Sequence, residues 1–285
     1  MGQFYDSIPP NLIEWIQKQH IFWVATAPLS QSGHVNLSPK CTRGMFHVVD
    51  ESKVWYEDMT GSGIETISHI RENGRVTILF TAFEGPPRIV RLFGTGTIHE
   101  FGSPEYNALI SPEARQPGSR AVIMVDVHKV GSSCGYSIPF FDFKSDRNQL
   151  HQWAARREKF DAETDQDING KPQNSTTGTQ VSEKGIRAYW LNNNMASIDG
   201  IPGLDTAPNS EMAREKEVWG FSGKRVYKSD KAMVEKSHNR GLGMGGHGVV
   251  VDKSFLVGFG MGAVVVGLVG WAQILGRGVV DTYWN

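Results

Sequence analysis

The sequence predicts a mainly β protein with short helices, folded as an antiparallel barrel or sandwich. Between residues 20 and 130, short apolar runs rich in β-branched and aromatic residues follow one another at close spacing. The links between these runs are of turn length or hold a short helical pattern, which favours an antiparallel sheet over a parallel one. The chain has 285 residues, 39% hydrophobic and 21% charged. That composition is typical of a globular protein with one large domain or a domain plus extensions.

Seven runs have strand character, at residues 21–26, 34–38, 45–49, 53–56, 75–83, 88–100 and 121–130, and from them we expect a barrel of about six strands. Pro39 is expected to end the second run. Short helices are expected at residues 12–20, 63–73, 103–110 and 146–159, where apolar residues recur at helical spacing. Gly94 and Gly96 fall inside a predicted strand and indicate a β-bulge or a close approach of backbone.

The C-terminal part of the chain is less regular. Residues 161–180 are polar and turn-rich, as in a loop or linker, and 181–220 carry only short apolar islands. Residues 236–248 are basic and glycine-rich and are expected to be a connector. Residues 254–275 then run without a formal charge, a length that can cross a hydrocarbon core. We expect a tail anchor that leaves residues 1–250 on the cytosolic side of an intracellular membrane; the alternatives are a segment folded back onto the domain and a poorly ordered tail.

Composition excludes several classes of function. The formal net charge is −1 and no basic block is interleaved with aromatic residues, so nucleic-acid binding is not expected. Cys41 and Cys134 are too few for a disulfide framework, and the nine histidines are scattered without a metal-binding spacing. We expect no metal site and a reducing compartment. The sequence has no GxGxxG opening a βαβ unit, no P-loop and no secretory signal at its start.

The turn Thr60-Gly61-Ser62-Gly63 stands between a strand and a helical pattern. Unpaired backbone N–H groups and the helix dipole at such a turn suit an anion. The alternative is that Ser62 or Thr60 caps the helix.

Polar side chains gather at the ends of the predicted strands and form the candidate cofactor site. Cationic groups beside a Gly/Ser turn can neutralise a phosphate dianion through charge-assisted hydrogen bonds. The candidate residues are Asn36, Ser38, Lys40, Asp58, Thr60, Gly61, Ser62, Arg88 and Arg91.

Three motifs occur in order: HVNLSPK, then VWYEDMTGSGIETISHIRENGRVTILF, then PPRIVRLFGTGTI. In this order they resemble the pyridoxamine 5′-phosphate oxidase-like family of flavin-binding split β-barrels. The resemblance covers residues 8–160, which leaves 161–250 as an extension and linker before the segment 254–275. It implies a six-stranded antiparallel split barrel and a homodimer with FMN held at the subunit interface.

The resemblance assigns roles to some candidate residues. Ser38 and Lys40 match the strand that contacts the flavin, and Thr60, Gly61 and Ser62 match the turn on its phosphate side. The true pyridoxamine phosphate oxidases carry Ser-Arg-Lys at this turn, and their C-terminal Arg-x-His signature is not evident here. Oxidation of vitamin B6 is therefore not expected. The sequence predicts an FMN-dependent oxidoreductase of unknown substrate and without an assigned catalytic residue. The alternatives are a non-catalytic dimeric split-barrel scaffold and a deazaflavin- or haem-binding relative.

Overall fold

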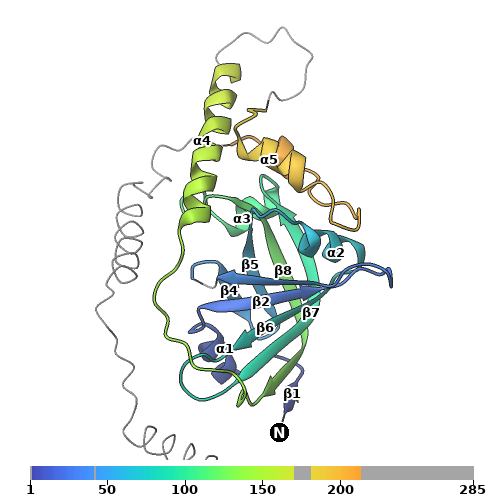
Figure 1. The fold of residues 1–285 in the computed structure, drawn as a ribbon, viewed down its shortest axis with the longest axis vertical. Coiled ribbons are helices and arrows are strands. Elements are labelled where there is room, and N and C mark those ends of the chain that lie inside the picture. The colour runs from blue at the N-terminus through green and yellow to red at the C-terminus, as the bar shows by residue number, and fades with distance from the viewer. Residues whose placement is uncertain (1, 42, 170–180, 213–285) are drawn as a thin grey trace, which may run out of the picture. The chain divides into compact units, whose positions relative to one another are not determined.

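The fold is described from a computed structural model that covers residues 2–41, 43–169 and 181–212 (Figure 1). All of these residues belong to the first of two compact units, Met1–Asp230. Within this described part, no helix is long and apolar enough to cross a membrane. The expected connector at 236–248 and the expected membrane helix at 254–275 lie outside the described residues.

Eight antiparallel strands form one sheet that curls into a half-barrel (Figure 1). Their order is β3-β2-β6-β7-β8-β5-β4, and β1 pairs with β8 away from this path. The mainly β, antiparallel barrel is confirmed, with more strands than the six expected. The strands are β1 (Gln3–Tyr5), β2 (Ile21–Thr26), β3 (Asn36–Cys41), β4 (Phe46–Asp50), β5 (Lys53–Met59), β6 (Arg75–Thr81), β7 (Ile89–Glu100) and β8 (Ser119–Ser133).

The inward-facing side chains of the curled sheet share one core, and in β2 buried and partly exposed residues alternate. In β2, Phe22 and Val24 are fully buried while their neighbours are partly exposed. Rings from four strands meet inside the half-barrel: Phe22 lies 5.0 Å from Phe46, 5.3 Å from Tyr56 and 5.7 Å from Phe80 between centroids. Burying an aromatic side chain of this size stabilises the fold by about 1.5–3 kcal/mol.

Strand β3 does not end at Pro39 as expected. It runs on to Cys41, and Pro39 pairs with Trp23 of β2. Proline lacks an N–H and is tolerated where a strand has a free edge. Within the described residues β3 pairs only with β2 and lies at the edge of the sheet, so the expectation was wrong because an edge strand can continue through a proline.

The expectation for Gly94 and Gly96 is confirmed. The register between β7 and β8 shifts between Phe93 and Gly94, which is a β-bulge. A Cβ on Gly94 would lie 2.6 Å from the carbonyl oxygen of Asp126, and one on Gly96 would lie 2.9 Å from the Ile70 side chain. Both positions are therefore close approaches that exclude a side chain.

Five α-helices and one 3-10 turn accompany the described part of the sheet. They are α1 (Pro10–Ile16), α2 (Glu65–Asn73), α3 (Pro104–Leu109), α4 (Gln149–Asn169), α5 (Ile186–Asn193) and the 3-10 turn Ala207–Asn209. Helix α1 ends before His20, where the sequence pattern had placed its end.

Helix α4 continues ten residues beyond the expected end at 159, so the expectation of a loop from 161 was wrong for residues 161–169. The acidic residues that suggested a loop are buried against a cation. Asp161 accepts hydrogen bonds from the N–H groups of Ile186 and Arg187, at 2.7 and 3.0 Å. Asp165 accepts one from the Arg187 guanidinium at 2.6 Å.

Residues 181–212 pack against the barrel. Trp190 of α5 is fully buried and lies 6.0 Å from the Phe101 ring. The Glu100 carboxylate at the end of β7 accepts backbone N–H groups of residues 205–207 and also pairs with Arg71. Helices α4 and α5 consequently cover the same end of the barrel as α2 and α3 (Figure 1).

Candidate functional site

An ion cluster joins the two sides of the open half-barrel. Lys40 on the edge strand β3 donates to Asp58 Oδ1 on β5 at 2.7 Å, and Arg120 on β8 donates from Nε to Asp58 Oδ2 at 2.8 Å. We call these three residues the seam cluster. Their side chains are 17%, 0% and 4% exposed for Lys40, Asp58 and Arg120. Lys40 and Asp58 thus meet at the seam, although the two residues belong to strands at opposite sides of the sheet.

The charge balance of the seam cluster is set by burial and by the two cations. Burial alone would raise the pKa of Asp58, but Lys40 and Arg120 outweigh it and lower the pKa below its ordinary value. Asp58 is therefore ionised at neutral pH. Two cations facing one carboxylate leave one positive charge in excess.

A polar row extends the seam cluster along β3. Asn36, Ser38 and Lys40 alternate along the strand and so share one face. The Ser38 hydroxyl donates to Asn36 Oδ1 at 2.7 Å, and Asn36 Nδ2 lies 3.0 Å from the hydroxyls of Thr26 and Thr66. Since Thr66 is on α2, this row links β3 to the helix that follows the Gly/Ser turn.

Thr60 at the start of the turn is fixed from two sides. Its N–H and its hydroxyl both reach the carbonyl oxygen of Gly118, each at 2.7 Å. Its hydroxyl oxygen also accepts a hydrogen bond from the Trp190 indole at 2.8 Å. Thr60 is buried, so its hydroxyl serves the internal structure and does not face a ligand.

Gly61 and Gly63 are held through their carbonyl groups. Asn194 Nδ2 donates to the Gly61 oxygen at 3.0 Å, and Arg120 Nη1 donates to the Gly63 oxygen at 3.0 Å. Helix α2 has Ile64 at its N-cap position and no side-chain cap. The alternative in which Ser62 or Thr60 caps the helix is therefore wrong.

The outer side of the turn is open. Ser62 is exposed, and nothing lies within 4 Å of a Cβ placed on Gly61. In the described part of the chain, the N–H groups of Gly61, Ser62 and Gly63 meet no acceptor. On the Gly63 side, the Glu65 carboxylate lies so close that a Cβ on Gly63 would collide with it. The turn therefore offers backbone donors to solvent, with one carboxylate beside them.

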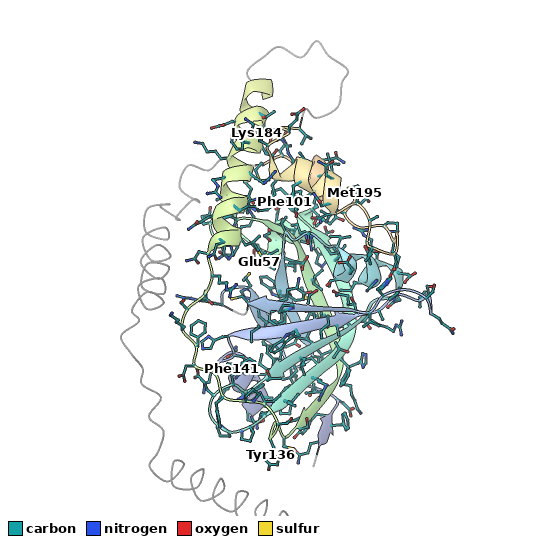
Figure 2. All side chains as sticks on the ribbon, in the orientation of Figure 1. Glu57, Phe101, Tyr136, Phe141, Lys184 and Met195 are labelled. Carbon is teal, nitrogen blue, oxygen red and sulfur yellow. The ribbon has the colours of Figure 1, made fainter. Side chains whose placement is uncertain are left out.

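A groove of about 1150 Å³ adjoins the seam and includes Lys40 in its wall. An extended segment after β8 forms its outer side, where Phe141 lies along the barrel (Figure 2). The Phe141 N–H donates to the Phe83 carbonyl at 3.1 Å, and the Phe143 ring stacks on His20 at 3.7 Å. The charged side chains of the groove are Lys18, Lys40, Arg43, Lys144, Arg147, Glu84, Asp142 and Asp146. Cations are in excess, and the wall also holds several aromatic rings.

Thr81 is an unusual member of the groove wall. It is 7% exposed, and its hydroxyl has no hydrogen-bond partner within the described structure. A buried polar group without a partner costs about 1–3 kcal/mol. The hydroxyl is thus available to a group bound in the groove.

The other two predicted residues do not join the seam. The Arg88 guanidinium lies 5.7 Å from the Trp15 ring, and Trp15 belongs to the groove wall. Arg91 lies on β7, opposite Leu79 and Gly131 in the flanking strands. The described interactions of these two arginines include none with the seam cluster.

A family model described as "Pyridoxamine 5'-phosphate oxidase" matches residues 8–134. The pyridoxamine 5′-phosphate oxidase family protein ustO of Aspergillus flavus is 38% identical over 214 residues, which cover 73% of this chain and 80% of the relative. The chain belongs to the pyridoxamine 5′-phosphate oxidase family. Its alignment with the Aspergillus relative is longer than the family model, so this member shares more than the barrel with that relative.

Two solved structures are similar in part. HupZ from Group A Streptococcus is 25% identical, and the match covers 44% of this chain and 99% of HupZ with a TM-score of 0.37. A pyridoxamine 5′-phosphate oxidase-related, FMN binding protein from Nostoc punctiforme is 12% identical, with 45% and 85% coverage and a TM-score of 0.34. These two structures are therefore not used to infer the chemistry of this protein.

Sequence reasoning missed the residues that reach the site from far along the chain. Arg120, Trp190 and Asn194 lie 62, 130 and 133 residues from their partners Asp58, Thr60 and Gly61. A local pattern cannot register such pairs. The sequence shows only that each of the three is a large or polar residue, and nothing near it in the chain identifies its partner.

A buried acidic cluster behind the turn was also missed. Glu158 of α4 is fully buried and accepts both terminal nitrogens of Arg115, at 2.9 and 2.7 Å, and the Gly118 N–H at 2.7 Å. Glu57 on β5 is 3% exposed, and burial raises its pKa from 4.5 to about 7. The label of Glu57 in Figure 2 marks this place at the foot of α4. The cluster docks α4 onto the loop that holds Thr60.

Proposed function

We propose that this chain binds FMN at the seam and the adjoining groove and acts as an FMN-dependent oxidoreductase. The observation that carries the proposal is the open turn 60–63. Its backbone donors face solvent beside a seam cluster with one excess positive charge, in a chain that belongs to a family of oxidases. Substrate and electron acceptor are not part of the proposal.

The residues present fit the cofactor. A flavin needs a polar seat for its phosphate and a groove with aromatic walls and hydrogen-bond donors for its ring. The turn supplies Ser62 and unpaired N–H groups for the phosphate, and the groove supplies the partnerless Thr81 hydroxyl. Neutral donors thus take the place of the arginine and lysine that the true oxidases carry at the turn.

Within this proposal most of the predicted residues have a distinct task. Ser62 binds the phosphate, and Lys40 contributes charge where the seam meets the groove. Asn36 and Ser38 fix the face of β3, while Asp58 and Thr60 hold the turn and the cations in place. Arg88 borders the groove through Trp15, and we assign no task to Arg91. When bound, FMN supplies the redox chemistry of its ring, and the protein orients it.

The test is a flavin-binding measurement with a variant that leaves the fold untouched. Ser62 is exposed and makes no described hydrogen bond, so Ser62→Ala should keep the melting temperature while weakening FMN binding about three- to tenfold, as expected for the loss of one ordinary hydrogen bond. Ser52→Ala, at another exposed serine, is the matched control. The purified wild-type protein should be yellow and be stabilised by added FMN. A colourless protein that FMN does not stabilise would contradict the proposal.

A second candidate is a non-catalytic split-barrel scaffold that dimerises without a flavin. Two observations favour it: Lys40 and Arg120 already neutralise Asp58, and Glu65 places a negative charge beside Gly63. Under this candidate, Lys40→Met changes stability but FMN has no effect on either protein. A deazaflavin- or haem-binding protein would be recognised from the absorption spectrum of the material released from native protein and from its mass.

Two further proposals rest on the sequence and the family resemblance. We propose a homodimer, which sedimentation of the purified chain would test through its mass. We also propose that residues 254–275 anchor the chain to an intracellular membrane. A chain ending at Gly248 should then move from the membrane fraction to the soluble fraction, and unchanged fractionation would refute the anchor.

A further inference from the structure

An extended segment, residues 136–147, crosses the outer side of the groove between two firmly held elements. It follows β8, which pairs with β7, β5 and β1, and it precedes α4, which Glu158 ties to Arg115 and Gly118. Its own backbone belongs to no helix or strand. Figure 2 shows Phe141 of this segment beside the barrel. We call residues 136–147 the strap.

The contacts that hold the strap lie near the surface. The Phe141 N–H donates to the Phe83 carbonyl at 3.1 Å, and the Phe143 N–H donates to the Glu84 carboxylate at 3.0 Å. The Phe143 ring stacks on His20 with 3.7 Å between the centroids. Phe141 and Phe143 nevertheless remain 58% and 42% exposed. A segment with exposed hydrogen bonds and little buried apolar area opens locally more readily than the sheet beneath it.

The strap also covers a thiol. Cys41, at the end of the edge strand β3, is half-buried in the groove wall. Its thiol donates to Asp146 Oδ1 of the strap at 3.6 Å, and Asp146 Oδ2 pairs with Arg43 at 3.1 Å. Burial raises the pKa of the Cys41 thiol above its ordinary value, and the Asp146 charge adds to this effect. Because the thiolate is the reactive form, the reactivity of Cys41 reports whether the strap lies over it.

We propose that the strap is a gate, which moves away from the barrel to admit a ligand to the groove and closes over the bound ligand. A ligand shifts such an equilibrium only if it binds the closed form better. Lys144 and Arg147 are carried by the strap, belong to the groove wall and meet no partner among the described residues. An anionic ligand therefore gains contacts with both cations only when the strap is closed. The opening of the strap is independent of the proposed function, whereas the choice of FMN as its ligand rests on that function.

Alkylation of the full chain by iodoacetamide, followed separately for Cys41 and Cys134 by mass spectrometry, measures the opening without a ligand. The exposed Cys134 is the internal control, and wild-type Cys41 should react about tenfold more slowly or less. Phe143→Ala removes the stack on His20 and should speed Cys41 about three- to tenfold without changing Cys134. Phe140→Ala is the matched control, because Phe140 is 80% exposed on the same strap, and it should match wild type. Equal Cys41 rates in wild type and Phe143→Ala refute the gate.

A second arm adds FMN to wild type, with binding measured independently from the quenching of its fluorescence. Bound FMN should slow the reaction of Cys41 and leave Cys134 unchanged. If FMN binds and Cys41 keeps its rate, the gate is refuted and the proposed function stands. If FMN does not bind but Phe143→Ala speeds Cys41, the proposed function falls, while the opening of the strap stands with a ligand other than FMN.

Hydrogen exchange of the wild-type protein needs no substitution and decides the question where a variant fails to fold. The Phe141 and Phe143 amides should exchange together, and faster than the amides of β2, which is paired on both sides. If these two amides are as protected as those of β2, the strap does not open and the inference is refuted.

Discussion

Replacing Asp58 by asparagine should destabilise the barrel more than any change at an exposed ion pair. Both carboxylate oxygens of Asp58 are engaged, one by Lys40 at 2.7 Å and one by Arg120 at 2.8 Å. Asparagine keeps the size of the side chain but removes its charge. The two cations then face each other across a neutral, fully buried amide.

The expected cost follows from how far each cation can reach water. Breaking a buried ion pair by removing one partner costs about 3–5 kcal/mol. Lys40 is 17% exposed in the groove wall and can turn toward solvent, whereas Arg120 at 4% cannot. Only Arg120 is then left as an uncompensated buried charge. We therefore expect a loss of stability near the lower end of this range, about 3 kcal/mol. For a domain of this size that lowers the melting temperature by about 6–12 °C.

Denaturant unfolding of the two proteins measures this difference, with the transition slope checked for constancy. The matched control is Asp126→Asn, which breaks the surface pair with Lys53 at 3.2 Å, whose side chains are 44% and 59% exposed. That change should cost less than about 0.5 kcal/mol. If Asp58→Asn costs no more than the control, the seam cluster does not hold the barrel together and the reasoning fails.

Two further changes test the surroundings of the turn. Glu57 is protonated in the folded state up to its pKa of about 7 and in the unfolded state only up to about 4.5, so its contribution to stability is complete below pH 4.5 and is lost as the pH rises through 7. The loss is about 3 kcal/mol; Glu57→Gln should remove this part of the pH dependence, and unfolding curves between pH 4.5 and 8 that parallel wild type would speak against it. Glu65→Gln removes the carboxylate beside Gly63 and should tighten FMN binding about two- to fivefold without changing riboflavin binding. Glu72→Gln, at the exposed far end of the same helix, is its control, and an equal gain there would exclude the local explanation.

The parts of the fold that could be predicted are those with a local physical cause. The bulge at Gly94 was predictable because a glycine inside a β-branched run has few other uses. Asn36, Ser38 and Lys40 were grouped together because all three stand at the end of one predicted strand.

The parts that could not be predicted depend on pairs far apart in the chain. The acidic residues of α4 suggested a solvated loop, since nothing nearby showed that Arg187 would bury them. The cap expected from Ser62 or Thr60 failed for a similar reason. Trp190 and Gly118 occupy the Thr60 hydroxyl, so it is not available to the helix. Sequence patterns identify the polar residues at strand ends. Their hydrogen-bond partners are distant in the chain and are brought to them only by the fold.

Pro39 at the free edge of β3 has a consequence for how the chain behaves at high concentration. An edge strand with apolar side chains is a template for strand addition by a second molecule, and Leu37 on this edge is 62% exposed. Proline has no N–H to offer, so it interrupts the row of donors that an incoming strand would need. Replacing Pro39 should therefore leave the monomer folded but make it aggregate on storage. Pro39, which was expected to end the strand, thus limits the pairing of β3 with β3 of a second molecule.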